Sequence, residues 1–199
     1  MSAQMLELAP ELALAAALAW GAGIRLYAVV FLLGLAQMLG WWQLPEHLQV
    51  LGHPLVLGTA AFMAVVELFA DKLPLLDSVW DALHTFIRIP AGAALAASVF
   101  GDAGAATAIA AALLGGSLTA TTHFAKSGTR AAANASPEPF SNFLLSSIED
   151  LLVPFGLWLA AAWPLVFLAL ILIFVLAAAL ALRMLLRGLR RLLRRPQAP

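Results

Sequence analysis

LVFLALILIFVLAAALAL, residues 165–182, contains no charged or polar side chain. A helix that spans the hydrocarbon core of a bilayer needs about 20 mostly apolar residues, and the apolar run from about Leu165 to Leu186 meets that length. The composition of the whole chain is also suited to a lipid bilayer. Of its 199 residues, 63% are hydrophobic and only 11% are charged, whereas soluble domains carry about 25% charged residues. The sequence therefore predicts an integral membrane protein.

Five more apolar stretches precede this run. We expect them to form helices over about Leu12–Leu39, Leu55–Ala70, Leu75–Phe100, Ala105–Phe124 and Phe140–Ala162. The predicted fold is an all-α integral membrane protein with about six transmembrane helices. Residues 1–182 form a single polytopic membrane domain, and residues 183–199 form a basic cytoplasmic C-terminal tail. The chain has no cysteine, which excludes disulfides, thiolate metal sites and cysteine nucleophiles.

The distribution of basic residues predicts an orientation. Six arginines fall between Arg183 and Arg195, and cytoplasmic segments of membrane proteins are enriched in lysine and arginine. Six spans would place both termini in the cytoplasm, with Lys72, Lys126 and Arg130 on the same side. The loops expected outside contain neither lysine nor arginine. The N-terminus has no basic start of a secretory signal, so we read it as mature sequence.

Three spans contain residues that interrupt helices. Gly21, Gly23 and Arg25 lie in the middle of the first span, and a proline followed by glycine lies in two others, at Pro90 and Pro154. Proline removes a backbone donor, and glycine weakens a helix interior. Irregular backbone at membrane depth occurs only inside protein or beside a watery cavity, so we expect these segments to be broken and buried.

Two polar stripes precede the two prolines. In DSVWDALHTFIR, residues 77–88, four side chains recur at steps of four, three and four, which places them on one helix face: Asp77, Asp81, His84 and Arg88. Steps of four and three residues also separate Asn142, Ser146 and Glu149 in the fifth span, where Asp150 directly follows Glu149. A third cluster ends the fourth span: His123, Lys126 and Arg130. We expect all three groups to face the interior.

A central polar site follows from the free energy of insertion. An ionisable group at membrane depth costs about 2.5–3.5 kcal/mol, so Arg25 and Arg88 need carboxylates. Those available are Glu149, Asp150, Asp81 and Glu67. We predict a site where the first, third and fifth helices meet, with Arg25 and Arg88 at its deep end.

Structural alternatives remain open for several of these residues. Asp71, Lys72 and Asp77 suit a helix start, where acids favour capping and the helix dipole. Arg88 fits a structural ion pair, and Lys126 and Arg130 fit a role in orientation alone. His84 fits a hydrogen-bonded core residue, although Asp77, Asp81 and His84 would also offer ligands to a divalent ion. The metal and any cofactor stay undetermined. The segment 134–142 fits either a turn with a cap or a loop that contacts substrate.

Several motifs in order resemble a known family: GIRLY, ADKLPLLDSVWDALHTFIRIPAGA, HFAKSGTR and SPEPFSNFLLSSIEDLL. Over roughly residues 20–160 the chain is similar to the bacterial membrane family named domain of unknown function 4126. The resemblance implies a small multi-helix protein of the bacterial cytoplasmic (inner) membrane. It implies no activity, and the last span and basic tail lie outside the motifs.

Transport or conduction is the leading functional hypothesis, because it requires a polar site at depth, broken helices and mixed charge. The substrate would be an ion, a small anionic solute held by Arg25 and Arg88, or a lipid head group. Asp81, His84 and Glu149 would carry protons. A structural or assembly protein with a buried ion-pair network is the alternative. A membrane enzyme acting on lipid is a third hypothesis, although no catalytic motif is present and no catalytic residue is assigned.

Three kinds of partner are expected. The arginine-rich tail would attract anionic lipid, and the polar site would bind a small solute or ion. Small residues such as Gly115 and Gly116 permit close packing of helices, which would allow a homo-oligomer to form. Nothing in the sequence indicates a nucleic-acid partner.

Overall fold

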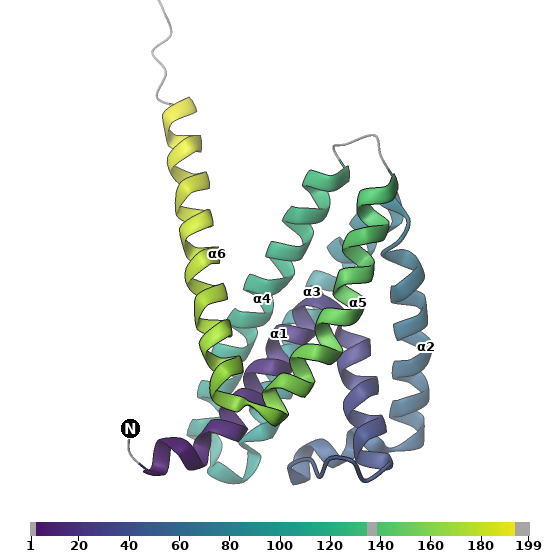
Figure 1. Cartoon of the computed structure of the whole chain (residues 1–199), viewed down its shortest axis with the longest axis vertical. Helices are drawn as coiled ribbons and strands as arrows, with labels where there is room; N and C mark the ends of the chain where they lie inside the picture. The colour runs from purple at the N-terminus through teal and green to yellow at the C-terminus, as the bar shows by residue number, and fades with distance from the viewer. Residues whose placement is uncertain (1–2, 135–138, 194–199) are drawn as a thin grey trace, which may run out of the picture.

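A computed structural model of the chain describes residues 3–134 and 139–193. The described residues form helices throughout, joined by short turns (Figure 1). The six α-helices are α1 (Ala3–Met38), α2 (Pro54–Ala70), α3 (Pro74–Val99), α4 (Ala105–Asn134), α5 (Pro139–Ala162) and α6 (Pro164–Leu193). Two short 3-10 helices, η1 (Glu46–Gly52) and η2 (Gly101–Ala103), lie in the connections.

α1 is broken at Arg25, as the sequence predicts. Arg25 has φ −145° and ψ 83°, which is extended rather than helical backbone. Beyond this point the chain turns back, and Figure 1 shows the two arms of α1 running to the same end of the bundle. The arms also touch: a Cβ on Gly21 would lie 2.6 Å from Cγ2 of Val29. Residues eight apart in a straight helix are about 12 Å apart along its axis, so α1 is a helical hairpin with Arg25 at its apex.

The hairpin is the centre of the molecule. α1 packs against all five other α-helices, and 67% of its most apolar stretch is buried inside the protein, against 6% for α6. Small residues on its first arm make this close packing possible, since alanine lets neighbouring backbones approach. Those fully buried are Ala13, Ala17, Ala19 and Ala22. The other helices therefore surround α1, and most of α6 is left on the outside.

Length and composition support a multi-pass membrane protein. Five helices are long and apolar enough to cross a bilayer: α1, α3, α4, α5 and α6. The short α2 passes the same test only together with η1, from which it is bent by 67°, which makes six candidates at most. The bounds of these segments agree with the expected ones, but α1 folds back at Arg25 and is not the single straight span that was expected. Because the arms of α1 return to one end, however, the arrangement does not support termini on the same side: α1 begins at one end of the bundle and α6 finishes at the other (Figure 1).

The breaks expected at Pro90 and Pro154 are not present. Both prolines lie inside continuous helices, α3 and α5. The glycines that follow them serve close packing instead. A Cβ on Gly92 would overlap Oγ1 of Thr119 in α4, and one on Gly156 would overlap the Trp20 ring in α1. The prediction was wrong because these glycines allow helix contact, and the missing donor of a single proline does not end either helix.

Candidate functional site

The polar stripe of α3 faces the interior, as predicted. Asp77, Asp81, His84 and Arg88 are all buried, with Arg88 at 0% exposure. The opposite face of α3 is exposed and apolar, and it includes Val79, Leu83 and Phe86. A stripe of four ionisable or polar groups is therefore held inside the helix bundle, where each group needs a partner.

Arg88 binds two carboxylates from two helices. Its Nη2 lies 2.6 Å from Oε1 of Glu67 in α2, and its Nη1 lies 2.8 Å from Oδ1 of Asp81, two turns earlier in α3. Nη1 also lies 3.3 Å from Nδ1 of His123 in α4. Glu67 and Asp81 were two of the four carboxylates expected to neutralise the deep arginines. Arg88 thereby ties α2, α3 and α4 together.

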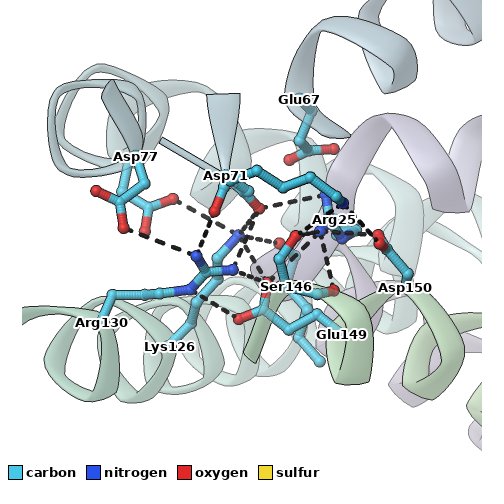
Figure 2. A network of polar contacts seen from close by, with 12 residues as sticks. Arg25, Glu67, Asp71, Asp77, Lys126, Arg130, Ser146, Glu149 and Asp150 are labelled. Atoms are coloured by element: carbon cyan, nitrogen blue, oxygen red, sulfur yellow. Dashed lines mark hydrogen bonds and ion pairs between the residues drawn. The ribbon is translucent and has the colours of Figure 1, made fainter. Parts of the chain in front are cut away.

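Arg25, at the apex of α1, binds three acids and one hydroxyl (Figure 2). Its guanidinium lies 3.2 Å from Asp71, 2.8 Å from Asp150 and 3.9 Å from Glu149. Nη2 also donates to Oγ of Ser146 over 2.8 Å and to the Ser146 carbonyl over 3.2 Å. The predicted meeting of α1 with the polar stripe of α5 is confirmed, because Ser146, Glu149 and Asp150 all reach Arg25.

Lys126 lies at the crossing point of the network. Its ammonium is 2.7 Å from Asp71, 3.4 Å from Glu149 and 3.8 Å from Asp81. It also donates to the main-chain carbonyl of Ile24 over 2.9 Å. In an unbroken helix that carbonyl would accept from the amide four residues on. Lys126 replaces that donor where α1 is broken, and it joins the Arg25 and Arg88 clusters into one network.

Arg130 completes the network one turn further along α4. Nε and Nη2 donate to the two carboxylate oxygens of Glu149 over 3.3 and 2.8 Å, the forked geometry that makes arginine–carboxylate pairs strong. Nη1 donates to the Asp71 carbonyl over 2.6 Å and lies 3.7 Å from Asp77. Asp77 also accepts from Asn134 over 3.2 Å. Lys126 and Arg130 are therefore structural members of the site, beyond any role in orientation.

The two buried histidines are held by hydrogen bonds. Nδ1 of His84 lies 2.9 Å from the Trp80 carbonyl, so it must donate, and Nε2 lies 3.1 Å from the Tyr27 hydroxyl. A neutral His84 accepts the Tyr27 proton there. Nδ1 of His123 faces Arg88, which can only donate, and Nε2 lies 2.7 Å from Oγ1 of Thr85. Both rings therefore have partners that a neutral imidazole satisfies.

Asp71 is the main residue that sequence reasoning missed. We expected it to favour a helix start, but it follows the C-terminus of α2, is 0% exposed and contacts three cations: Arg25, Lys126 and Arg130. Burial by itself raises the pKa of this carboxyl, but Lys126 and Arg25 together hold the pKa below its usual value. A charged pair at residues 71–72 looks like an ordinary interfacial turn, and only the fold-back of α1 brings Arg25 to it.

Other expected residues have different outcomes. Lys72 lies 3.3 Å from Asp150 and is partly exposed, so the network reaches the surface there. The side chain of Asn142 and the segment 135–138 lie outside the described residues. Among the described residues no group of three histidine or acidic side chains is placed to hold a metal. Asp77, Asp81 and His84, which were considered as ligands of a divalent ion, instead bind Arg130, Arg88 and Tyr27 respectively.

Clefts approach the network from two sides of α4. One of about 370 Å³ lies between α4, α5 and α6 and is mainly apolar, with Lys126 and Glu149 in its wall. A second of about 210 Å³ lies between α3 and α4 and includes Asp81, His123 and Arg130. The charged groups are therefore buried within the protein but lie next to open space.

A third cleft lies at the opposite end of the bundle. It measures about 940 Å³ and is lined by polar groups from both ends of α1 and from the loops, among them Glu11, Gln37 and Gln43. Between this cleft and the apex at Arg25, both arms of α1 carry buried apolar side chains, which we call the apolar plug: Ala17, Leu18, Ala22, Val29 and Leu33. The plug separates the polar cleft from the ion-pair network.

The comparisons with known proteins agree with the family resemblance. Residues 12–184 match the model of a family described as Domain of unknown function (DUF4126). The match covers more than the motif-bearing part, since it extends through most of α6. No curated protein and no solved structure matches the chain.

Proposed function

Because the chain belongs to the DUF4126 family, whose description assigns no activity, we propose its function from its geometry: a small multi-pass membrane protein that moves an ion or small charged solute across the bilayer. The observation that carries this proposal is Lys126, which contacts Asp81 and Glu149, two acids that line different clefts. Movement of this one ammonium between its acids would open or close a path through the network.

The arrangement along α1 supports a transport cycle. A polar cleft, an apolar plug and a charged network follow one another from one end of the bundle to the apex of a broken helix. Transporters place their sites at such helix breaks near the membrane midplane, and apolar constrictions close water paths by excluding water. In this arrangement the network is sealed from the polar cleft, and it reaches the surface on the other side through the partly exposed Lys72 and Asp150.

The charges favour a cation or a proton over an anion. Arg25 and Arg88 were the groups expected to hold an anionic solute, but both guanidinium groups already bind carboxylates at 2.6–3.2 Å. An anion would have to displace those acids into a low-dielectric interior. A proton or a small cation would instead bind to acids that are already present.

A structural role is the second candidate, and the density of pairing favours it. Arg88 has no exposed surface and joins three helices, and Arg25, Lys126 and Arg130 each bind acids from different parts of the chain. Breaking one partner of a buried ion pair is strongly destabilising. Such a network would hold the fold-back of α1 in place for an assembly function without any flux.

Flux through reconstituted protein tests the proposal. The wild-type chain would be placed in liposomes that contain a pH-sensitive dye, and a potassium gradient with valinomycin would supply the driving potential. We expect proton entry faster than in protein-free liposomes. Sodium, potassium and chloride would be tested with ion-specific dyes in liposomes without valinomycin. Rates equal to those of protein-free liposomes for all four ions would overturn the transport proposal and favour the structural role.

We propose an orientation from the basic residues. The turn between α2 and α3 and the C-terminal ends of α4 and α6 lie at one end of the bundle (Figure 1), which we assign to the cytoplasm of a bacterial cell. These segments carry Lys72, Lys126, Arg130 and the exposed Arg183 and Arg187. The start of α1 would then lie outside, consistent with the lack of lysine and arginine in the first 24 residues. The arginines of α6 would contact anionic lipid, and the exposed face of α6 would be available to a second copy.

A further inference from the structure

The network contains more acids than bases. Among the described residues its ion pairs involve five cations, Arg25, Lys72, Arg88, Lys126 and Arg130, and six carboxylates, Glu67, Asp71, Asp77, Asp81, Glu149 and Asp150. With every group ionised, the network would carry one uncompensated negative charge. The two partly exposed members, Lys72 and Asp150, pair with each other, so the surplus remains among the other, more buried groups. An unpaired charge inside a protein in a membrane is costly, which favours one bound positive charge in the network.

Glu67 is the carboxyl with the fewest partners. It has 0% exposure and contacts one cation, Arg88, through Oε1 alone. Its other oxygen, Oε2, is buried without a hydrogen-bond partner among the described residues. Oδ1 of Asp71 is also buried without such a partner, but Oδ2 of Asp71 contacts three cations. Among the described residues Asp77 contacts one cation, Arg130 at 3.7 Å, and it also accepts hydrogen bonds from Asn134 and Ser78.

The groups around Glu67 favour a neutral carboxyl. The charged groups that act on it are Arg88 from α3, Lys126 from α4, Arg25 from α1 and Asp71 one turn further along its own chain. Arg88 is shared with Asp81, and Lys126 and Arg25 are bound directly by Asp71. A protonated Glu67 still accepts the Arg88 hydrogen bond through its carbonyl oxygen Oε1, so this contact is kept, while Arg88 retains its ion pair with Asp81.

The nearby histidines are poorly placed to supply the missing charge. A protonated His123 would turn an N–H toward the guanidinium of Arg88, 3.3 Å away. His84 would become charged only if Tyr27 stopped donating to Nε2 and accepted instead. Glu67 can take up the proton without either rearrangement.

We propose that Glu67 is the proton-binding site of the network and holds one proton in this conformation, which makes the five cations and five remaining carboxylates neutral. Release of the proton would require a path of water molecules that reaches Oε2. The proton site itself does not depend on the proposed function. Its role in transport does rest on that function, and there it identifies the transported or coupled ion as a proton.

Infrared spectroscopy of the full chain in lipid nanodiscs tests this site without measuring flux. At neutral pH the wild type should show the carbonyl stretch of a protonated carboxyl, and the band should shift when glutamate, but not aspartate, is labelled with carbon-13. The band should be lost in Glu67→Gln and retained in Glu149→Gln, a matched change to a glutamate that accepts two hydrogen bonds from Arg130.

Thermal unfolding of the same two variants supplies a second comparison. Because an amide mimics a neutral carboxyl, Glu67→Gln should shift Tm by less than about 3 °C, whereas Glu149→Gln should lower it by more than about 5 °C.

Three infrared results would overturn the proposal: no carboxyl band in the wild type, a band that shifts with aspartate labelling, or a band that persists in Glu67→Gln. The proposal would also be overturned if the wild type had a higher Tm in a sodium salt than in a choline salt of the same ionic strength, since a metal cation would then supply the missing charge. If Glu67→Gln does not fold, glutamate labelling of Glu149→Gln decides the question, because Glu67 is then the one glutamate left in the network among the described residues. A confirmed band with no flux would refute transport alone.

Discussion

Lys126 donates a hydrogen bond over 2.9 Å to the main-chain carbonyl of Ile24, the residue just before the break in α1. The same ammonium lies 2.7 Å from Asp71, which binds Arg25 at 3.2 Å. One side chain of α4 therefore satisfies the backbone group that the break exposes and links to the arginine at the apex. The fold-back of α1 and the charge network depend on each other.

Replacing Lys126 should destabilise the protein strongly. Lys126→Met leaves the Ile24 carbonyl without its donor and Asp71 with one cation fewer, and loss of a buried partner costs about 3–5 kcal/mol. Lys72→Met is the matched control, because Lys72 is partly exposed and such pairs contribute about 0–1 kcal/mol. Thermal unfolding in detergent measures both. Equal Tm values for the two variants would contradict a central role for Lys126.

The direction of α1 can be measured by cysteine labelling, because the chain has no cysteine of its own. Single cysteines at Glu7, Trp41 and Asp102 should react with a membrane-impermeant maleimide from one side, and one at Arg190 from the other. All four positions are exposed. A straight first span with termini on the same side would instead put Glu7 with Arg190. Labelling of Glu7 and Arg190 from the same face would refute the hairpin.

Much of the site follows from helical spacing alone. The steps from Asp77 to Arg88 and from Ser146 to Glu149 place these side chains on one face of any regular helix, and burial of charge then forces the two faces inward. The glycines before Arg25 likewise predict a break. These inferences need only local geometry and the free energy of moving a charge into lipid.

The return of α1 is not encoded in a local pattern. Residues 12–39 are apolar enough to span the bilayer in one direction, and nothing in their periodicity tells a span from a hairpin. The turn is stabilised by groups that are distant in sequence and come together only in the folded protein. Asp71 and Asp150 bind Arg25, and Lys126 binds the Ile24 carbonyl. Asp71 was misjudged for the same reason, since its partners lie more than 40 positions away in sequence.

Close helix contact at Gly92 can be tested against an open glycine. Gly92→Ala would push its Cβ into Thr119 and should cost about 1–3 kcal/mol through overpacking. Gly128→Ala is the control: Gly128 lies in α4, a Cβ added there would meet no neighbouring atom within 4 Å, and alanine favours helix by about 1 kcal/mol. Tm should fall for the first variant and hold or rise for the second. A tolerated alanine at position 92 would show that α3 and α4 are not packed as described.

Proton flux by two variants of acidic residues tests the central claim most directly. Asp81→Asn changes an acid that binds Arg88 and lies 3.8 Å from Lys126, whereas Glu46→Gln changes an exposed acid of η1. In liposomes of equal protein content, we expect Asp81→Asn to lower the proton rate at least about tenfold, a change of about 1.4 kcal/mol in barrier, and Glu46→Gln to leave it unchanged. Equal rates for a folded Asp81→Asn and the wild type would contradict a path through the network.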